Sequence, residues 1–135
     1  MDKPSLISSD NIYYLNIFPD YISIKLFHAG TVKIPMIDII KIEASKNYSV
    51  FHIIGHEPII SANNLIYQSK KINSKYFFRA NKSCFINLFQ LEIVSKTNPV
   101  TVLMTDKTQI LISQRKKTHF LAMHQFFLYE TSEKA

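Results

Sequence analysis

Cationic, amide and hydroxyl side chains are concentrated between two apolar patches in residues 77–87. Arg79, Asn81, Lys82 and Ser83 lie close together there, with phenylalanines before and after them. Side chains of these types bind anionic partners through charge and hydrogen bonds, and charge-assisted hydrogen bonds are the stronger ones. The pattern predicts an exposed polar loop on a buried platform.

A second group of cations follows Ser113, which is a suitable N-cap for the last expected helix. Arg115, Lys116 and Lys117 lie in the next turn, where they face the partial positive charge and the free amide groups of a helix N-terminus. Such cations are locally unfavourable until an anion docks, and the amides and cations then form a phosphate site. A basic surface turn without a ligand is the alternative.

The net charge of +6 is unevenly distributed along the chain. Residues 1–57 contain five lysines and six acidic residues, whereas residues 58–91 contain five cations and no acidic residue. A surface of one sign attracts polyanions and speeds their encounter with the protein, whether the polyanion is nucleic acid or an anionic membrane. A solvated lysine face is the alternative.

Other chemistries lack the residues that they need. With two glycines, the chain can contain neither a P-loop nor the glycine fingerprint of dinucleotide-binding proteins. No carboxylate or thiol completes a recognisable metal-ligand set with His52 and His56, or with His119 and His124. Cys84 lies in an apolar run and is predicted to be a small buried residue. We therefore expect no metal, no cofactor and no catalytic residue.

Length and hydropathy predict one domain. The chain has 135 residues, of which 47% are hydrophobic, enough for a single core. No apolar segment of a secretory signal follows residues 1–4, and no run approaches the roughly 18 apolar residues of a membrane span. The sequence predicts a cytoplasmic protein without a membrane partner.

The elements that position the polar residues are predicted to be mainly strands. Apolar and polar residues alternate with a period of two, which places one face of each strand in a core. The pattern repeats on both sides of residues 105–108, which predicts a hairpin turn. Strands are expected over residues 22–26, 39–43, 48–54, 58–61, 91–94, 100–104 and 110–112.

Two segments break this alternation and predict helices. Ser61 is expected to cap a short helix over residues 63–72, with Leu65 and Ile66 on its apolar side. A second helix is expected over residues 114–129, docked on the core; a partner-binding helix is the alternative. The predicted fold class is mainly β (α+β), with small packed β-sheets, one short helix and a C-terminal helix.

Three segments, in this order along the chain, resemble motifs of the LytTR family of bacterial DNA-binding domains. They are residues 42–48, 77–87 and 110–115, and the helical pattern over residues 65–72 lies between the first two. The resemblance covers roughly residues 33–123. It implies a mainly β fold that inserts loops, instead of a recognition helix, into successive major grooves of duplex DNA, each about 12 Å wide. It therefore implies a sequence-specific transcription regulator.

The resemblance also implies that three loop regions form the DNA-reading surface. Lys82 is expected at a base edge, Arg79 and Ser83 at phosphates, and the Arg115 guanidinium at a guanine. Asn87 is expected to be a structural hydrogen-bonding residue. The expected DNA-binding residues are Lys46, Asn47, Tyr48, Ser49, Arg79, Asn81, Lys82, Ser83, Arg115, Lys116 and Lys117.

The chain departs from the family pattern at some of these positions. Family members often have arginine or histidine where Asn81 and Lys82 stand, and arginine where Gln114 stands, so the base sequence that they bind does not transfer. Most family members also follow a receiver domain or membrane helices. Only the residues before position 33 precede the resemblance here, and they are not expected to form an input domain.

We expect residues 1–32 to be an N-terminal arm or extra strand, residues 33–129 the DNA-binding domain, and residues 130–135 a polar tail. The expected partners are double-stranded DNA, a second copy on repeated sites, and a signalling protein. One alternative is a protein-interaction module that titrates another regulator without binding DNA. Another is binding of single-stranded RNA through exposed aromatics such as Tyr48, Tyr76 and Phe78.

Overall fold

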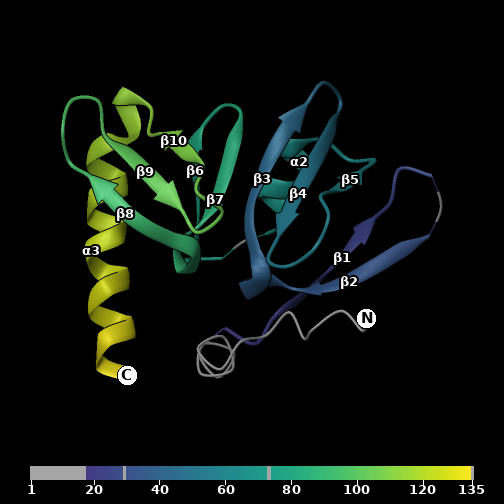
Figure 1. Ribbon diagram of the computed structural model, residues 1–135, viewed down its shortest axis with the longest axis horizontal. Coiled ribbons are helices and arrows are strands. Elements are labelled where there is room, and N and C mark those ends of the chain that lie inside the picture. Colours follow the sequence, from purple (N-terminus) through teal and green to yellow (C-terminus); the bar gives the residue numbers. More distant parts are fainter. Residues whose placement is uncertain (1–17, 29, 73, 135) are drawn as a thin grey trace.

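The computed structural model describes residues 18–28, 30–72 and 74–134, which form a hairpin, two antiparallel sheets and two α-helices (Figure 1). The strand order is β5-β4-β3-β7-β6 in the five-stranded sheet and β10-β9-β8 in the three-stranded sheet. The hairpin consists of β1 and β2. The elements are β1 (Tyr21–Lys25), β2 (Thr31–Pro35), η1 (Met36–Asp38), β3 (Ile39–Ser45), β4 (Tyr48–Ile53), β5 (Ile59–Ser61), α2 (Leu65–Lys71), β6 (Phe77–Asn81), β7 (Cys84–Asn87), η2 (Leu88–Gln90), β8 (Leu91–Ser95), β9 (Thr101–Met104), β10 (Gln109–Leu111), η3 (Gln114–Lys116) and α3 (Lys117–Lys134).

The first hydrophobic cluster joins the β1–β2 hairpin, α2 and one face of the five-stranded sheet. Ile22 and Ile24 are buried and alternate with exposed residues along β1, and Phe51 and Ile53 are buried and alternate with half-buried residues along β4. The alternation follows from the pleat of a strand, which turns successive side chains to opposite faces. Phe18 enters the same cluster and packs on Tyr76, with ring centroids 4.8 Å apart.

The second cluster lies between the other face of that sheet and the three-stranded sheet with α3. Ile86 and Ala80 contribute from β7 and β6, Val102 from β9, and Phe120, which is fully buried, from α3. Strands β6 and β7 are therefore covered on both faces. Burial on both faces explains why residues 77–87 contain apolar residues in succession instead of alternating ones.

The predicted fold class is confirmed, since 42% of the described residues are in strands and the C-terminal helix α3 is present. Each of the expected strands is present within one or two residues of its predicted ends. The expected hairpin is also present, because β9 and β10 pair on either side of residues 105–108. The period-two pattern did not identify β2, although one face of that strand is open to solvent.

The polar loop predicted over residues 77–87 is wrong in extent. These residues form a β-hairpin, β6 and β7, and only Lys82 and Ser83 are in its turn. Pairing of β7 with β3 and of β6 with β7 satisfies the backbone groups that a loop would leave to solvent. The exposed polar part is therefore the tip of the hairpin.

The predicted helix ends also need correction. Helix α2 begins at Leu65, and its N-cap is Asn64, whose Oδ1 accepts a hydrogen bond from the Tyr67 amide at 2.8 Å. Ser61 does not cap it, because that serine is buried in β5, where its hydroxyl accepts hydrogen bonds from Gln68 Nε2 and the Asn63 amide. Helix α3 begins at Lys117, after the 3-10 turn η3, and continues past Tyr129 to Lys134.

Part of the expected N-terminal arm lies outside the described residues, namely residues 1–17. The remainder includes β1, which pairs with β2 from Tyr21 to Lys25. Leu26 also bridges to Ser61, so that the hairpin is joined to β5 at the edge of the five-stranded sheet. The division of the chain at residues 32 and 33 stays a prediction.

Candidate nucleic-acid interface

The turns of two hairpins lie next to each other at one end of the five-stranded sheet. Strand β3 pairs with β7, and the Ala44 amide donates a 2.9 Å hydrogen bond to the Ser83 carbonyl. The β3–β4 turn at Lys46 and Asn47 therefore neighbours the β6–β7 turn at Lys82 and Ser83. Both turns, and the segment that leads into α3, lie along the upper side of Figure 1.

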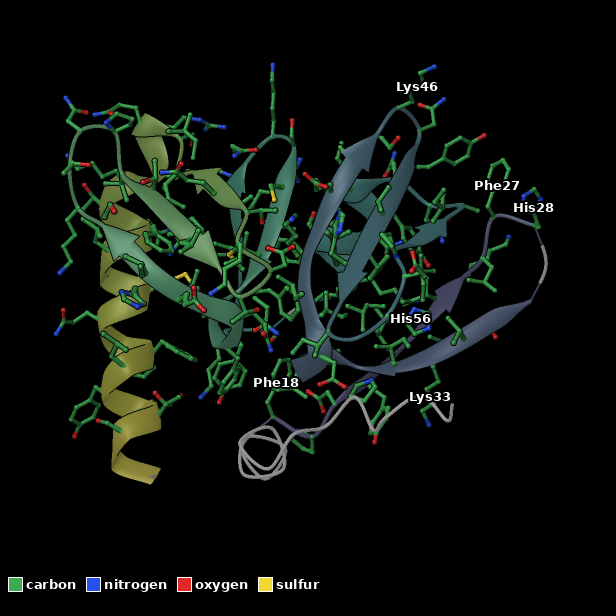
Figure 2. The ribbon with its side chains drawn as sticks, viewed as in Figure 1. Phe18, Phe27, His28, Lys33, Lys46 and His56 are labelled. Atoms are coloured by element: carbon green, nitrogen blue, oxygen red, sulfur yellow. The ribbon has the colours of Figure 1, made fainter. Side chains whose placement is uncertain are left out.

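The β3–β4 turn presents Lys46 and Asn47 to solvent. Lys46 has φ of 55°, a left-handed conformation that is uncommon for lysine, and Figure 2 shows its side chain at the tip of the hairpin, pointing away from the sheet. Tyr48, which is 37% exposed, packs edge-on against Phe27 with ring centroids 4.7 Å apart. The turn therefore projects two polar side chains beside a supported aromatic ring.

Ser49, although expected at the interface, is fully buried. Its hydroxyl donates to the Asn63 carbonyl at 2.8 Å and accepts from Gln68 Nε2 at 3.3 Å. Both partners lie in or just before α2, so Ser49 attaches that helix to β4. In this conformation it has no surface that a nucleic acid could contact.

The β6–β7 turn is held in shape by Arg79 and Asn81. Arg79 Nε donates to the Asn81 carbonyl at 2.9 Å, and Nη2 donates to the Lys82 carbonyl at 2.7 Å. Asn81 Oδ1 accepts from the Ser83 amide at 2.8 Å, and its Nδ2 donates to the Leu111 carbonyl at 2.7 Å. Much of the hydrogen-bonding capacity of both side chains is thus used within the protein. Lys82 remains exposed at the tip.

The third expected region, at Arg115 and Lys116, is joined directly to β6, the strand that leads into this turn. The Ser113 amide donates to the Ala80 carbonyl at 2.9 Å, and Lys116 Nζ donates to the Arg79 carbonyl at 3.0 Å. These two bonds hold η3 against β6. The second and third expected regions therefore form one continuous surface.

Ser113 does not act as the expected N-cap. Its side chain forms no capping bond, because the chain turns through η3 before α3 starts, and it is the Ser113 carbonyl that accepts the Lys116 amide at 2.9 Å. The Ser113 hydroxyl is shielded from solvent without a hydrogen-bond partner among the described residues. Buried hydroxyls without a hydrogen-bond partner are uncommon in folded proteins.

A hollow of about 510 Å³ lies between α2, the β6–β7 turn and η3, and we call it the cationic hollow. Four of its seven described lining residues are lysine or arginine and none is acidic. A hollow with cations on several sides and no acid raises the local concentration of an anionic ligand. It is lined by Ile66, Arg79, Asn81, Lys82, Ser113, Arg115 and Lys116.

Crowding of these cations is visible in the acid–base properties of Lys116. Partial burial lowers the pKa of its ammonium below the ordinary value, and the positive charges of Arg79 and Arg115 lower it further. An anion between these groups would offset the repulsion between the cations. Lys117, the first residue of α3, is half-buried and is not among the lining residues.

Two structural expectations next to the interface are confirmed. Asn87 is fully buried, and its Nδ2 donates to the carbonyls of Met36, Ile37 and Ile39 at 3.3, 3.2 and 2.8 Å. Cys84 is buried in the second cluster. Burial, followed by the negative charge of Glu43, raises the pKa of its thiol to about 12. The thiolate, which is the nucleophilic form, is therefore negligible near neutral pH.

Among the described residues, no three His, Cys, Asp or Glu side chains are placed to hold a metal ion together. No helix of the described part is long and apolar enough to cross a membrane.

Ile66 lines the cationic hollow, although the sequence patterns did not predict it there. The spacing placed it on the apolar side of α2, but the buried residues of that helix are Leu65 and Gln68, and Ile66 is 55% exposed and lines the cationic hollow. Gln68 lies three positions after Leu65 and on the same helix face, but residue type alone does not show that this glutamine is buried.

Residues 29–125 match the LytTR family, whose members are described as LytTr DNA-binding domains. The chain belongs to the LytTR family. Among solved structures, it is similar to the LytTr DNA-binding domain of a Bacillus cereus protein described as a methyl-accepting/DNA response regulator, with a TM-score of 0.64 and 14% sequence identity. The match covers 76% of this chain and 94% of that chain, and at this identity it shows the shared fold alone. No curated protein matches the sequence.

The family assignment relates this chain to DNA-binding proteins. LytTR domains are the DNA-binding domains of transcription regulators. All of the expected DNA-binding residues lie within the matched range.

Proposed function

We propose that this LytTR domain binds a specific sequence in double-stranded DNA and regulates transcription by reading the major groove with loops. One observation carries the proposal: the β6–β7 turn and η3 lie side by side at a hollow that is lined by cations and, in the described part, by no acid, and the β3–β4 turn lies next to the β6–β7 turn. Turns that project from a rigid sheet fit a groove about 12 Å wide.

The cations divide into two roles. Lys116, whose ammonium is fixed beside β6 and crowded by Arg79 and Arg115, is suited to a phosphate, and Lys117 follows it as the first residue of α3. Phosphate contacts of this kind supply affinity through counterion release and set the register of the protein on the duplex.

The readout role falls on side chains that project freely. Lys46, Asn47, Tyr48 and Lys82 are exposed at the two turns. Arg115 is exposed at the rim of the cationic hollow, where its guanidinium can pair with O6 and N7 of a guanine. Such a bidentate pair discriminates against other bases by about 1 to 3 kcal/mol.

Three residues of the expected set take a different role in this proposal. Arg79 and Asn81 shape the β6–β7 turn through bonds to its backbone, which also places the Ser83 amide and hydroxyl at the tip. Ser49 anchors α2 and is left out of the interface. For the other residues of the expected set, the proposed contacts with DNA are supported by exposure and charge.

We extend the proposal to two copies of the domain on neighbouring repeats of one DNA face, with a signalling protein as a further partner.

The test is selection of bound duplexes from a random-sequence library across a salt series, followed by fluorescence anisotropy on the enriched sequence. The Lys82→Ala, Arg115→Ala double variant is the control. Enrichment of a short repeated motif that the double variant no longer binds supports the proposal.

Salt-sensitive binding without enrichment would contradict sequence-specific readout and leave a basic surface alone. Absence of duplex binding even at low salt would reject the proposal. That outcome would favour the protein-interaction module, which a purified LytTR regulator could test directly by complex formation in solution. Preference for single strands in competition would favour RNA binding instead.

A further inference from the structure

Ile66 occupies an unusual position for an exposed isoleucine. It is 55% exposed and projects from α2 into the cationic hollow, where every other described lining residue is polar or charged. Single exposed apolar residues are common on protein surfaces and need no explanation by themselves. An apolar side chain inside the hollow proposed for DNA binding is different, because it is stabilised on binding only if it is buried against an apolar part of the nucleic acid.

The position of Ile66 is fixed by the rest of α2. Leu65 is buried in the first cluster on one side of it. Gln68 is buried, and its Nε2 donates to the hydroxyls of Ser61 and Ser49 at 3.1 and 3.3 Å. Asn64 caps the first turn. A side chain held on an anchored helix can impose a sharper positional requirement on its ligand than one on a projecting loop.

The chemistry of duplex DNA offers few partners for such a side chain. Phosphates are charged, and most groups on the base edges are hydrogen-bond donors or acceptors. In the major groove, thymine alone among the four bases presents a methyl group, at C5. Arg115 and Lys82, which share the hollow, would place Ile66 next to a base edge and not in free solvent.

We propose that Ile66 is a specificity-determining residue that contacts the 5-methyl group of one thymine in each bound site. The inference rests on the proposed function and adds a contact from α2 to those of the three loop regions. The inference can be tested on this methyl group alone, because deoxyuridine differs from thymidine only by its absence. Burial of one such group is worth about a fourfold change in Kd.

The experiment uses the full chain and the duplex enriched by selection, in which each thymine is replaced in turn by deoxyuridine. Kd is measured by fluorescence anisotropy for the unaltered protein, Ile66→Ala, Ile66→Val and Ile93→Ala. Ile93 is the matched control, because it is 54% exposed on β8 and does not line the hollow. Both isoleucines are exposed, so their replacement should leave the fold intact.

We expect one thymine position at which deoxyuridine raises the Kd of the unaltered protein about fourfold. The same replacement should leave the Kd of Ile66→Ala unchanged within error, whereas Ile93→Ala and Ile66→Val retain the effect. Equal binding of all deoxyuridine duplexes by the unaltered protein would overturn the inference and leave sequence-specific binding intact. Methyl dependence that persists in Ile66→Ala would overturn it too. Failure of the selection to enrich any sequence would reject the proposed function, and the inference with it.

Discussion

Lys41 in β3 donates a 2.8 Å hydrogen bond to Asp106 in the β9–β10 turn and so joins the two sheets. The Lys41 side chain is 3% exposed and the Asp106 side chain 23% exposed. Lys41 Nζ also donates to the Thr108 hydroxyl at 2.8 Å. The five-stranded sheet carries both hairpin turns of the interface, and the chain after β10 leads into η3. The pair therefore helps to fix the two halves of the proposed surface relative to each other.

Replacement of Asp106 should cost more stability than replacement of Lys41. In Asp106→Ala the Lys41 ammonium stays buried without its counter-charge, which lowers the free energy of unfolding by about 3 kcal/mol. In Lys41→Met the carboxylate that remains has access to water, so the loss is about 1 to 2 kcal/mol. Urea denaturation measures both. The control is Lys107→Ala, which removes an exposed ion pair with Glu92 and should change stability by less than about 0.5 kcal/mol.

An equal effect of Asp106→Ala and Lys107→Ala would show that the buried position of Lys41 does not matter.

Stability should depend on pH through the same carboxyl. Burial disfavours the charged form of Asp106, but hydrogen bonds from Lys41 and Thr108 outweigh it and hold the pKa below its ordinary value of 3.8. Between the folded and unfolded pKa values the unfolded chain binds more protons, so stability rises with pH there. The contribution of Asp106 is therefore complete above about pH 4 and is lost as pH falls through the folded pKa.

Comparison of the unaltered protein with Asp106→Asn in urea, at several pH values from neutral to acidic, measures this contribution. The difference in unfolding free energy should be constant near neutral pH and shrink once the carboxyl is protonated. A difference that stays the same down to acidic pH would mean that the pKa of Asp106 is not lowered by folding.

The sequence predicted the fold because most strands have one face in a core. Alternation of apolar residues located β1 and the β9–β10 hairpin, and the apolar neighbours of Asn87 identified it as a buried hydrogen-bonding residue. The pattern failed over residues 77–87, where both faces of β6 and β7 are covered. Periodicity carries no information on strand geometry when both faces are buried.

The site was predicted less completely, for a different reason. Whether a polar side chain faces solvent or the protein depends on partners far away in the sequence. Ser49 bonds with residues near α2, and Arg79 bonds with the carbonyls of its own turn. Residue type alone distinguishes neither from a free ligand-binding group. Ile66 was hidden because only the position of Gln68 in the core shows which face of α2 is outside.

Arg79→Lys should separate charge from turn geometry. Lysine retains the positive charge but cannot reproduce the two bonds to the Asn81 and Lys82 carbonyls, since they require two nitrogens of one planar group. We expect the Kd for the selected duplex to rise about tenfold, the equivalent of one charged hydrogen bond. Binding to a random duplex should change little. Equal weakening on both duplexes would mean that Arg79 acts through its interaction with phosphate instead.

The readout roles of Lys82 and Arg115 predict different responses on specific and random DNA. Lys82→Ala and Arg115→Ala should weaken specific binding more than non-specific binding, by about 1 to 3 kcal/mol for Arg115, because a lost base contact matters only on the correct sequence. Lys70, which is exposed near the end of α2, provides the comparison. Lys70→Ala removes a charge and should weaken binding to both duplexes alike.

The measurement is the Kd of each variant on the selected duplex and on a random duplex across a salt series. Because a phosphate contact contributes to the salt dependence on any sequence, Lys70→Ala should reduce the slope of log K against log salt by nearly the same amount on both duplexes. Equal losses on specific and random DNA for all three variants would reject the readout roles of Lys82 and Arg115. The cationic hollow would then serve non-specific binding alone.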